Sequence, residues 1–231
     1  MSASAVPAPR RRPAWIPAVE ASALALFAWG WGDLAAAVAA ATDGPRAGAA
    51  VAAAAIAALV TADLVSGIGH WLCDRFFDER APIVGPLVVR SFREHHVAPD
   101  ALVRHGFVEL NGDSALVCLP LLLATTLLPP PDAGLPALAA HAFAAAFLLA
   151  ILLTNSVHRW AHADRAPRPV AWLQRRGVLL RPDDHARHHR GDHRLAYCIT
   201  TGWLNPVLDR TAFFDRLERG LGRLGAPPST R

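Results

Sequence analysis

Histidine is the residue whose number and spacing most clearly indicate chemistry in this 231-residue chain, which contains 11 histidines. His158 and His162 are four residues apart, so in a helix their rings project from one face, one turn apart. His185, His188 and His189 form an H-x-x-H-H pattern. Imidazole is a ligand that suits zinc, copper, iron and nickel. Each pattern is weak by itself, but together they indicate a metal site.

Two further groups extend this pattern. His95 and His96 are adjacent, and His70 shares a predicted helix face with Asp63 and Asp74. A carboxylate placed in this way can hold the second ring nitrogen of a ligand histidine, although Asp63 fits a hydrogen bond between helices equally well. One zinc ion almost always takes four ligands. Because eight imidazoles exceed that number, the sequence favours two metal ions.

The elements that must position these histidines are long apolar segments. The hydrophobic residues make up 53% of the chain and the charged residues only 18%. About 20 apolar residues suffice for a helix to cross the hydrocarbon of a membrane. The sequence therefore predicts an all-α integral membrane protein with about four transmembrane helices, at residues 16–41, 47–72, 114–128 and 136–157.

The arginines predict how these helices are oriented. All 23 basic residues are arginines, and only Arg46 falls on the far side of the predicted membrane. Arg10, Arg11 and Arg12 precede the first span, which by the positive-inside rule places the N-terminus in the cytoplasm. Ten of the 11 histidines then share the cytoplasmic face, where they form a His-rich cap that carries a dimetal site. An export signal is the alternative for the N-terminal segment, but its apolar run is longer than such signals usually have.

Several classes of function fit this pattern poorly. The arginines are not gathered into one element and do not alternate with aromatic residues, so no nucleic-acid partner is expected. A zinc hydrolase would be expected to carry an H-E-x-x-H motif, which this chain lacks. A transporter would place its ligands near the middle of the membrane. At the edge of the hydrocarbon the reachable part of a lipid is its unactivated chain, and oxidising that chain requires a redox metal and O2. Iron is therefore favoured if the substrate is a lipid.

Five runs of sequence carry a family resemblance, namely ADLVSGIGHWLCD (62–74), FREHHVAPDALVRHGFVELNGDS (92–114), TNSVHRWAH (154–162), DDHARHHRGDH (183–193) and YCITTGWLNPVLD (197–209). They resemble the plasmanylethanolamine desaturases, which are the Kua/CarF-type lipid desaturase domain proteins, over about residues 62–217. The resemblance implies an O2-dependent, di-iron oxidoreductase of the membrane that converts the 1-O-alkyl chain of an ethanolamine phospholipid to the 1-O-alk-1′-enyl (vinyl) ether of a plasmalogen.

The resemblance also implies roles for single residues. Asp74 is the acid of the family pattern near the site, whereas His105 and His193 are expected beside the ligands or facing the substrate. The sequence departs from the family pattern at residues 75–77, Gly106 and Gly191, and none of these departures removes an expected ligand. A related desaturase that acts on another lipid or on an acyl chain stays open, as does a His-rich membrane protein that binds or transports metal. The eight expected iron ligands are His70, His95, His96, His158, His162, His185, His188 and His189.

The remaining expectations concern organisation and partners. We expect a basic cytoplasmic N-terminus (1–15), a lipid desaturase domain (16–217) and a C-terminal tail (218–231). The expected partners are the ether phospholipid, the membrane lipid around the protein and an external electron donor, which is a ferredoxin, a cytochrome b5-like protein or a flavoprotein reductase. The predicted location is a bacterial inner membrane, crossed several times, with the active site on the cytoplasmic side. The sequence sets no oligomeric state.

Overall fold

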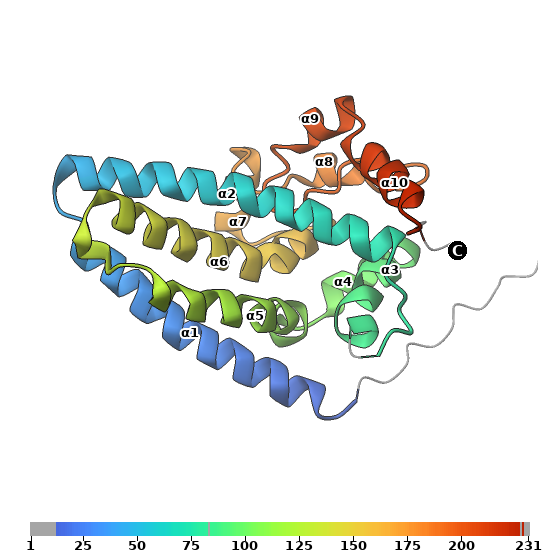
Figure 1. The fold of residues 1–231 in the computed structure, drawn as a ribbon. Coiled ribbons are helices and arrows are strands. Elements are labelled where there is room, and N and C mark those ends of the chain that lie inside the picture. Colours follow the sequence, from blue (N-terminus) through green and yellow to red (C-terminus); the bar gives the residue numbers. More distant parts are fainter. Residues whose placement is uncertain (1–12, 83, 227, 229–231) are drawn as a thin grey trace, which may run out of the picture.

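Four long helices dominate the computed structural model, which describes residues 13–82, 84–226 and 228. They are α1 (Ile16–Ala41), α2 (Gly44–Arg75), α5 (Phe107–Ala124) and α6 (Leu135–His162) (Figure 1). A short 3-10 turn at Thr125–Leu127 extends α5. All four are long and apolar enough to cross a membrane, and the described residues contain no strand. The prediction of an all-α membrane protein with about four spanning helices is confirmed.

Local sequence explains where these helices begin and what they present outward. Pro17, Pro45 and Pro136 each lie in the first positions of a helix, where the fixed proline φ angle fits and the missing N–H is not needed. Large apolar side chains such as Trp29 and Leu123 are about 70% exposed (71% and 70%). Exposed apolar surface of this kind on a spanning helix is what lipid tails would cover.

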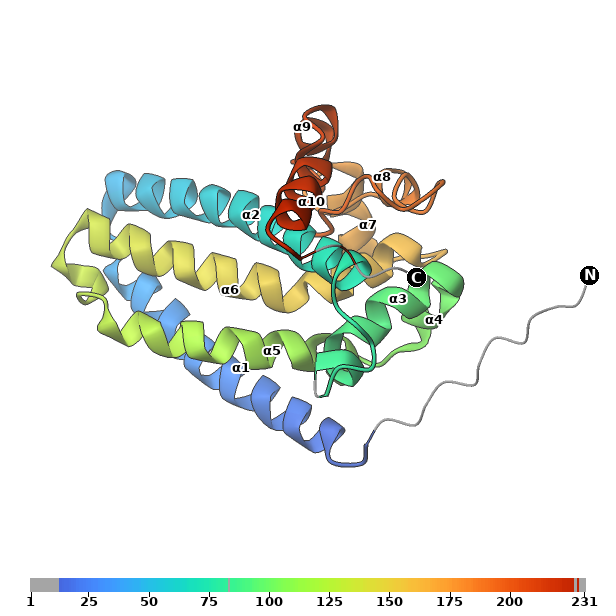
Figure 2. The ribbon, with the colours of Figure 1, turned by 45° about the vertical axis from the view of Figure 1, so that its right-hand side comes forward.

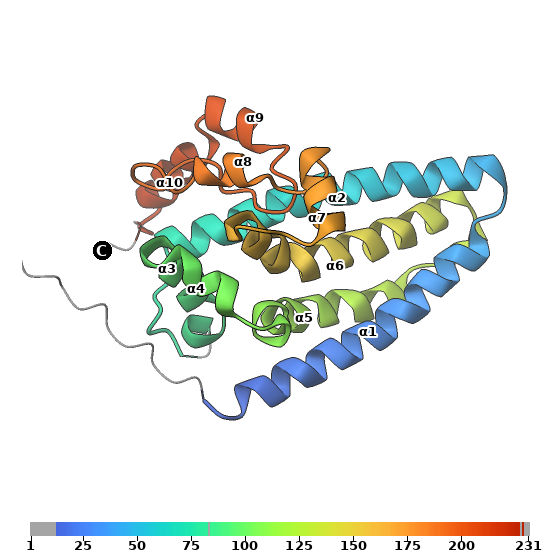
Figure 3. The same cartoon turned by 180° about the vertical axis from the view of Figure 1, so that it is seen from behind.

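The helices pack around α6, which lies between α2 and α5 (Figures 1 and 3). The α1 helix packs along α5, and their contact requires small residues. A Cβ added at Gly112 of α5 would lie 2.3 Å from the Cβ atom of Glu20 in α1. One core cluster joins three of the helices through Ala23, Phe27, Leu34, Ala115, Cys118, Leu122, Ala145, Leu148 and Leu152.

A cap of short helices covers the end of the bundle where α2 and α6 end (Figure 2). The α10 helix is strongly amphipathic, and its Phe214 packs against Trp71 and Tyr197. The helix spans position 218, where we predicted the C-terminal tail to begin. The short helices are η1 (Gly85–Val89), α3 (Arg90–Val97), α4 (Pro99–Arg104), α7 (Arg168–Arg175), α8 (Pro182–Ala186), α9 (Asn205–Arg210) and α10 (Phe213–Arg223), while η3 (Pro131–Ala133) lies at the opposite end between α5 and α6.

The helix bounds differ most from the predicted spans at α5. This helix begins at Phe107, whereas hydropathy placed the third span from residue 114. The difference arises because Asn111 and Asp113 lower the local hydropathy although both side chains are buried against protein. The Asn111 amide donates to the Phe107 carbonyl and accepts from the Ser156 hydroxyl. Arg10, Arg11 and Arg12, on which the predicted orientation depends, lie outside the described residues.

Candidate metal centre

All eight predicted ligand histidines converge at the capped end of the bundle. His70 lies in the last two turns of α2, and His158 and His162 lie in the last turns of α6. His95 and His96 come from α3. The other three come from α8 and the residues that follow it, namely His185, His188 and His189. Histidines from four separate stretches of sequence therefore meet in one buried cluster.

The cluster divides into two groups whose possible ligand atoms all lie within 4.8 Å of one another. His95 belongs to both groups, so it lies between the two candidate metal positions. We call them the five-histidine group (His95, His158, His162, His185 and His189) and the four-histidine group (His70, His95, His96 and His188).

The nitrogen atoms of the five-histidine group are arranged as metal ligands are. The Nε2 atom of His185 lies 2.9 Å from those of His158 and His162 and 3.1 Å from that of His189. A ring nitrogen carries at most one proton, so hydrogen bonds among these rings cannot satisfy all three contacts. A cation shared by the lone pairs would satisfy them, and the donor set therefore fits a metal ion.

Burial keeps these imidazoles in the neutral form that metal binding needs. The pKa of His95 and the pKa of His185 lie well below the usual value, first because of burial and then because of the neighbouring histidines. The same two causes lower the pKa of His189 to about 3. Protonated imidazole cannot bind a metal, so at neutral pH these three rings are ready to act as ligands.

Asp74 adds an anionic oxygen to the four-histidine group. Its Oδ2 atom lies 3.4 Å from the Nε2 atom of His70, 3.6 Å from that of His96 and 3.5 Å from that of His188. Asp74 follows His70 by four residues on the same face of α2, and its side chain is only 3% exposed. The structure thus brings the predicted acid to the histidine cluster, where a carboxylate would balance the charge of a divalent cation.

Backbone carbonyl groups fix two rings of the four-histidine group. The Nδ1–H group of His70 donates to the Tyr197 carbonyl at 3.1 Å, and that of His188 donates to the Leu195 carbonyl at 2.7 Å. With Nδ1 protonated, each ring directs the lone pair of Nε2 into the cluster. Such outer partners orient ligand histidines and tune their basicity.

Both carbonyls belong to residues 195–204, a segment without regular secondary structure that polar side chains hold against α2. Ala196 has a left-handed φ of 56°, and its N–H donates to Asp209 Oδ1 at 3.0 Å. The Asn205 amide accepts from the Cys198 N–H and donates to the Cys198 carbonyl. A Cβ added at Gly67 of α2 would lie 2.6 Å from Cys198 Sγ, so the segment packs closely on the helix.

Asp63 is the third support of the 195–204 segment. Its carboxylate accepts backbone N–H groups of Thr201 at 2.8 Å, Gly202 at 2.9 Å and Leu204 at 3.1 Å. The sequence predicted either a position behind the ligands or a bond between helices, and it gave no sign of this role. The sequence also gave no sign of the role of Asp209. Both aspartates accept backbone N–H groups of a segment that has no regular structure, and a local sequence pattern does not reveal such partners.

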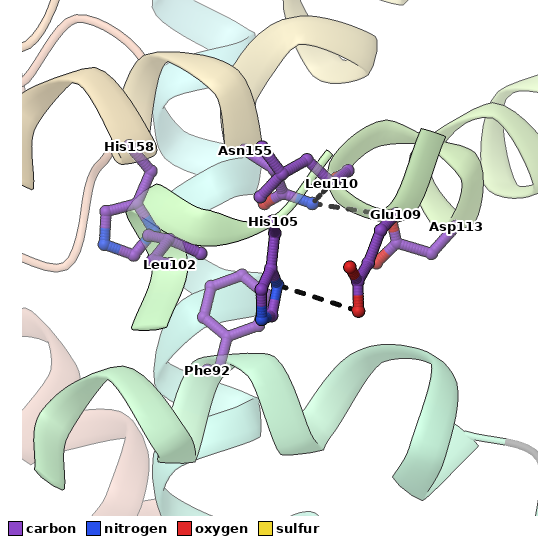
Figure 4. A pocket seen from close by; sticks show the side chains of 8 residues that line it. All are labelled: Phe92, Leu102, His105, Glu109, Leu110, Asp113, Asn155 and His158. Carbon is purple, nitrogen blue, oxygen red and sulfur yellow. Dashed lines mark hydrogen bonds and ion pairs between the residues drawn. The ribbon is translucent and has the colours of Figure 1, made fainter. Parts of the chain in front are cut away.

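The two other predicted site residues lie in different places. His193 stacks on His96 with ring centroids 4.5 Å apart, so it borders the four-histidine group. His105 makes no ring contact with any ligand histidine among the described residues. It pairs with Glu109 at 3.9 Å and lines a small cavity whose opposite wall includes His158 (Figure 4).

An apolar cavity of about 150 Å³ reaches the cluster from the side of the bundle. It lies between α2 and α5, over α6, and its lining includes Val65, His70, Val117 and Ile151. Val65 and Val117 are also exposed on the outer surface of the helices, by 41% and 60%. A hydrocarbon chain in the surrounding lipid would therefore have an apolar path that ends at a candidate metal ligand. We call this cavity the lateral groove.

Comparison with known proteins yields a consistent set of relatives. The sequence profile of the lipid desaturase domain matches residues 59–229. The chain is 39% identical over 160 residues to "Plasmanylethanolamine desaturase" of Myxococcus xanthus, and this alignment covers 69% of this chain and 56% of that protein. It is 39% identical over 167 residues to "Plasmanylethanolamine desaturase 1" of Mus musculus, covering 71% of this chain and 62% of the relative.

A plant protein shows a similar degree of likeness. The chain is 35% identical over 164 residues to "Fatty acid desaturase 4, chloroplastic" of Arabidopsis thaliana, which covers 70% of this chain and 49% of that protein. The aligned part thus spans only about half to three fifths of the length of these relatives. No solved structure matches the chain.

Proposed function

The chain belongs to the lipid desaturase family, and on that basis we propose that it converts the 1-O-alkyl ether chain of an ethanolamine phospholipid to the 1-O-alk-1′-enyl ether. The balanced reaction takes the alkyl lipid, O2, two electrons and two protons to the vinyl ether and two molecules of water. The observation that carries this proposal is the lateral groove, which ends at His70 beside the histidine cluster.

We propose two iron ions held by the eight histidines, with Asp74 beside the ion of the four-histidine group. Iron would supply the activation and reduction of O2, chemistry that zinc lacks because it has no redox activity. The residues of the chain would do the rest. They bind the lipid, hold its reacting carbons beside the centre and keep water away from them.

The position of the centre favours a bond near the lipid head group. The histidines lie at the ends of α2 and α6 and not at their middle. A chain that lies in the lateral groove would bring its first carbons, next to the ether oxygen, nearest to His70, while the rest of the chain extends toward Val117 and Ile151. A bond in the middle of an acyl chain would have to thread deeper past the cluster.

A second candidate substrate rests on the plant relative, whose name is that of a fatty acid desaturase. An acyl lipid would use the same groove and the same histidines, so substrate class separates the two proposals. A metal transporter fits less well, because ligands of a transport site lie near the middle of the membrane. We further propose that the active site faces the cytoplasm of a bacterial cell, where an external ferredoxin, cytochrome b5-like protein or flavoprotein reductase supplies electrons.

The experiment combines metal analysis with lipid analysis. The protein is expressed in a bacterial host that lacks vinyl ether lipids and is fed an alkyl glycerol, and vinyl ethers are measured by mass spectrometry before and after mild acid. We expect about two irons per purified chain and acid-labile vinyl ether lipids that His188→Ala abolishes. New double bonds in acyl chains alone would favour the second candidate. One zinc per chain, or product undiminished in His188→Ala, would refute the proposed centre.

A further inference from the structure

The proposed desaturation needs a supply of protons that the lateral groove does not provide. Each double bond formed consumes one O2, two electrons and two protons from outside the lipid, because the two hydrogens removed from the chain account for only half of those in two water molecules. Most of the surface that lines the groove is apolar, although Asp113 and Asn155 also border it, and apolar surface does not carry protons. A separate polar route to the histidine cluster is therefore required if the proposed function is correct.

Three ionisable side chains line a second, smaller cavity beside the groove, and one of them, Asp113, lines the groove as well. Glu109 and Asp113 are one turn apart on the same face of α5, and His105 precedes that helix and pairs with Glu109 at 3.9 Å. The exposed fraction falls in the order Glu109, His105, Asp113. The side chains of Glu109 and His105 are 32% and 18% exposed, and Asp113 as a whole residue is 7% exposed. The cluster therefore runs from the protein surface into its interior.

A cavity of about 10 Å³ joins this cluster to the histidines. It is lined by His105, Glu109, Asp113 and Asn155 on one side, and by Phe92 and His158 on the other (Figure 4). A volume of roughly 10–15 Å³ with two to four polar partners is what one buried water molecule needs. The cavity can thus hold a single water between His105 and the ring of a proposed ligand.

We propose that His105, Glu109 and Asp113 form the route by which protons reach the metal centre. Glu109 and His105 exchange protons with the solvent. The imidazole of His105 passes a proton to water in the cavity, and Asp113 accepts and returns protons at the buried end. His105 suits this step because a neutral imidazole has one donor and one acceptor nitrogen. The inference rests on the proposed function.

Two members of the cavity wall also have structural roles. Asp113 Oδ1 accepts the N–H of Ser114 at 2.7 Å and lies 3.4 Å from the amide nitrogen of Asn155. The amide of Asn155 in α6 donates to the Leu110 carbonyl of α5 at 2.8 Å, so Asn155 ties the two helices together and is not a suitable test residue. Recognition of an ethanolamine ammonium group by Glu109 and Asp113 is a rival role. The cavity is too small for that group, and the test below separates the two roles.

The test uses purified iron-loaded protein in lipid nanodiscs with alkyl lipid, O2 and a reduced electron carrier. The variants are His105→Ala and Glu109→Gln, with Glu79→Gln as the control because Glu79 is an exposed glutamate in the cap region outside this cluster. Iron content and thermal unfolding show whether the site still forms. A pH indicator in weak buffer measures proton uptake, and peroxide is measured against alkene formed.

We expect both variants to bind two irons and unfold like the wild type, while alkene formation falls about 100-fold, within the range for loss of a general acid–base group. Peroxide should account for most of the O2 consumed, and imidazole should restore alkene formation to His105→Ala. Unchanged alkene formation, loss of iron, or a change only in head-group preference would overturn the proton route. If the wild-type protein consumes O2 but desaturates a different lipid, the proposed substrate is wrong and the proton route still stands. If the wild-type protein consumes no O2, both the proposed function and the proton route are refuted.

Discussion

Replacing Asp209 with alanine is expected to release one of the two proposed metal ions and leave the other bound. Asp209 Oδ1 accepts the N–H of Ala196, and the carbonyls on either side of Ala196 hold His188 and His70. Both rings belong to the four-histidine group. Apart from the shared His95, the rings of the five-histidine group come from α6, α8 and the adjacent His189. Their hydrogen bonds join them to one another and not to carbonyls of residues 195–204.

The size of the effect follows from two costs at Ala196. Its N–H is buried, and an unsatisfied buried donor costs about 1–3 kcal/mol. Its left-handed φ of 56° costs roughly another 1–3 kcal/mol, and this conformation persists only when the surrounding contacts hold it in place. Without the carboxylate the segment would relax, and the carbonyls of Leu195 and Tyr197 would move away from the two rings. Loss of such an outer partner lowers metal affinity by about 10–100-fold.

The assay is the metal-to-protein ratio during titration with a chelator, measured on purified variants. Asp209→Ala should retain about one ion per chain under conditions where the wild type retains two. Asp209→Asn keeps an oxygen for the Ala196 N–H and loses mainly the ion pair with the half-exposed Arg187, which is worth little, so it should retain both ions. Asp215→Ala removes another cap carboxylate paired with an arginine and serves as the control. Equal loss from Asp209→Ala and Asp209→Asn, or loss of both ions together, would refute this reasoning.

Three further predictions concern packing, the groove and pH. Gly112→Ala should lower the free energy of unfolding in detergent by about 1–3 kcal/mol, because the added Cβ would collide with Glu20. Gly48→Ala should have no such effect, because its Cβ would meet nothing within 4 Å. Equal effects of the two substitutions would contradict the α1–α5 contact. Val117→Trp should block the lateral groove and lower product formation at least tenfold while the iron content stays full. Leu123→Trp, on the exposed surface of the same helix, should leave product formation unchanged. Equal activity of the two variants would show that the lipid chain binds elsewhere. Hydrogen bonds from Arg75 lower the pKa of Glu218. The pair therefore stabilises the fold fully above the usual glutamate pKa, and this stabilisation is lost as the pH falls through the lowered pKa. Glu218→Gln should flatten the dependence of the thermal unfolding temperature on pH in that acid range, and an unchanged dependence would count against the pair.

The sequence predicts the histidines well because their signals are local. Spacings such as that of His158 and His162 define a helix face without any knowledge of the fold. Asp63 shows the opposite case, because its three partners lie about 140 positions later and adopt no regular structure. Asn111 shows a third case, since its polar side chain lowers hydropathy although Phe107 and Ser156 satisfy it inside the bundle. Long-range satisfaction of polar groups is what a single sequence does not display.

Bringing these histidines together carries a cost that the bundle alone does not offset. His70, His158, His185 and His188 are each at most 2% exposed, and burying a polar group without a matching partner costs free energy. The Nε2 atom of His70 forms no hydrogen bond within the described part of the chain and lies 3.4 Å from Asp74 Oδ2. A bound metal ion would supply the missing partner, and its binding free energy would then become part of the folding free energy. Residues 195–204 should accordingly be the part of the fold most dependent on metal, because their carbonyls hold rings that are stably placed only when a cation occupies the four-histidine group.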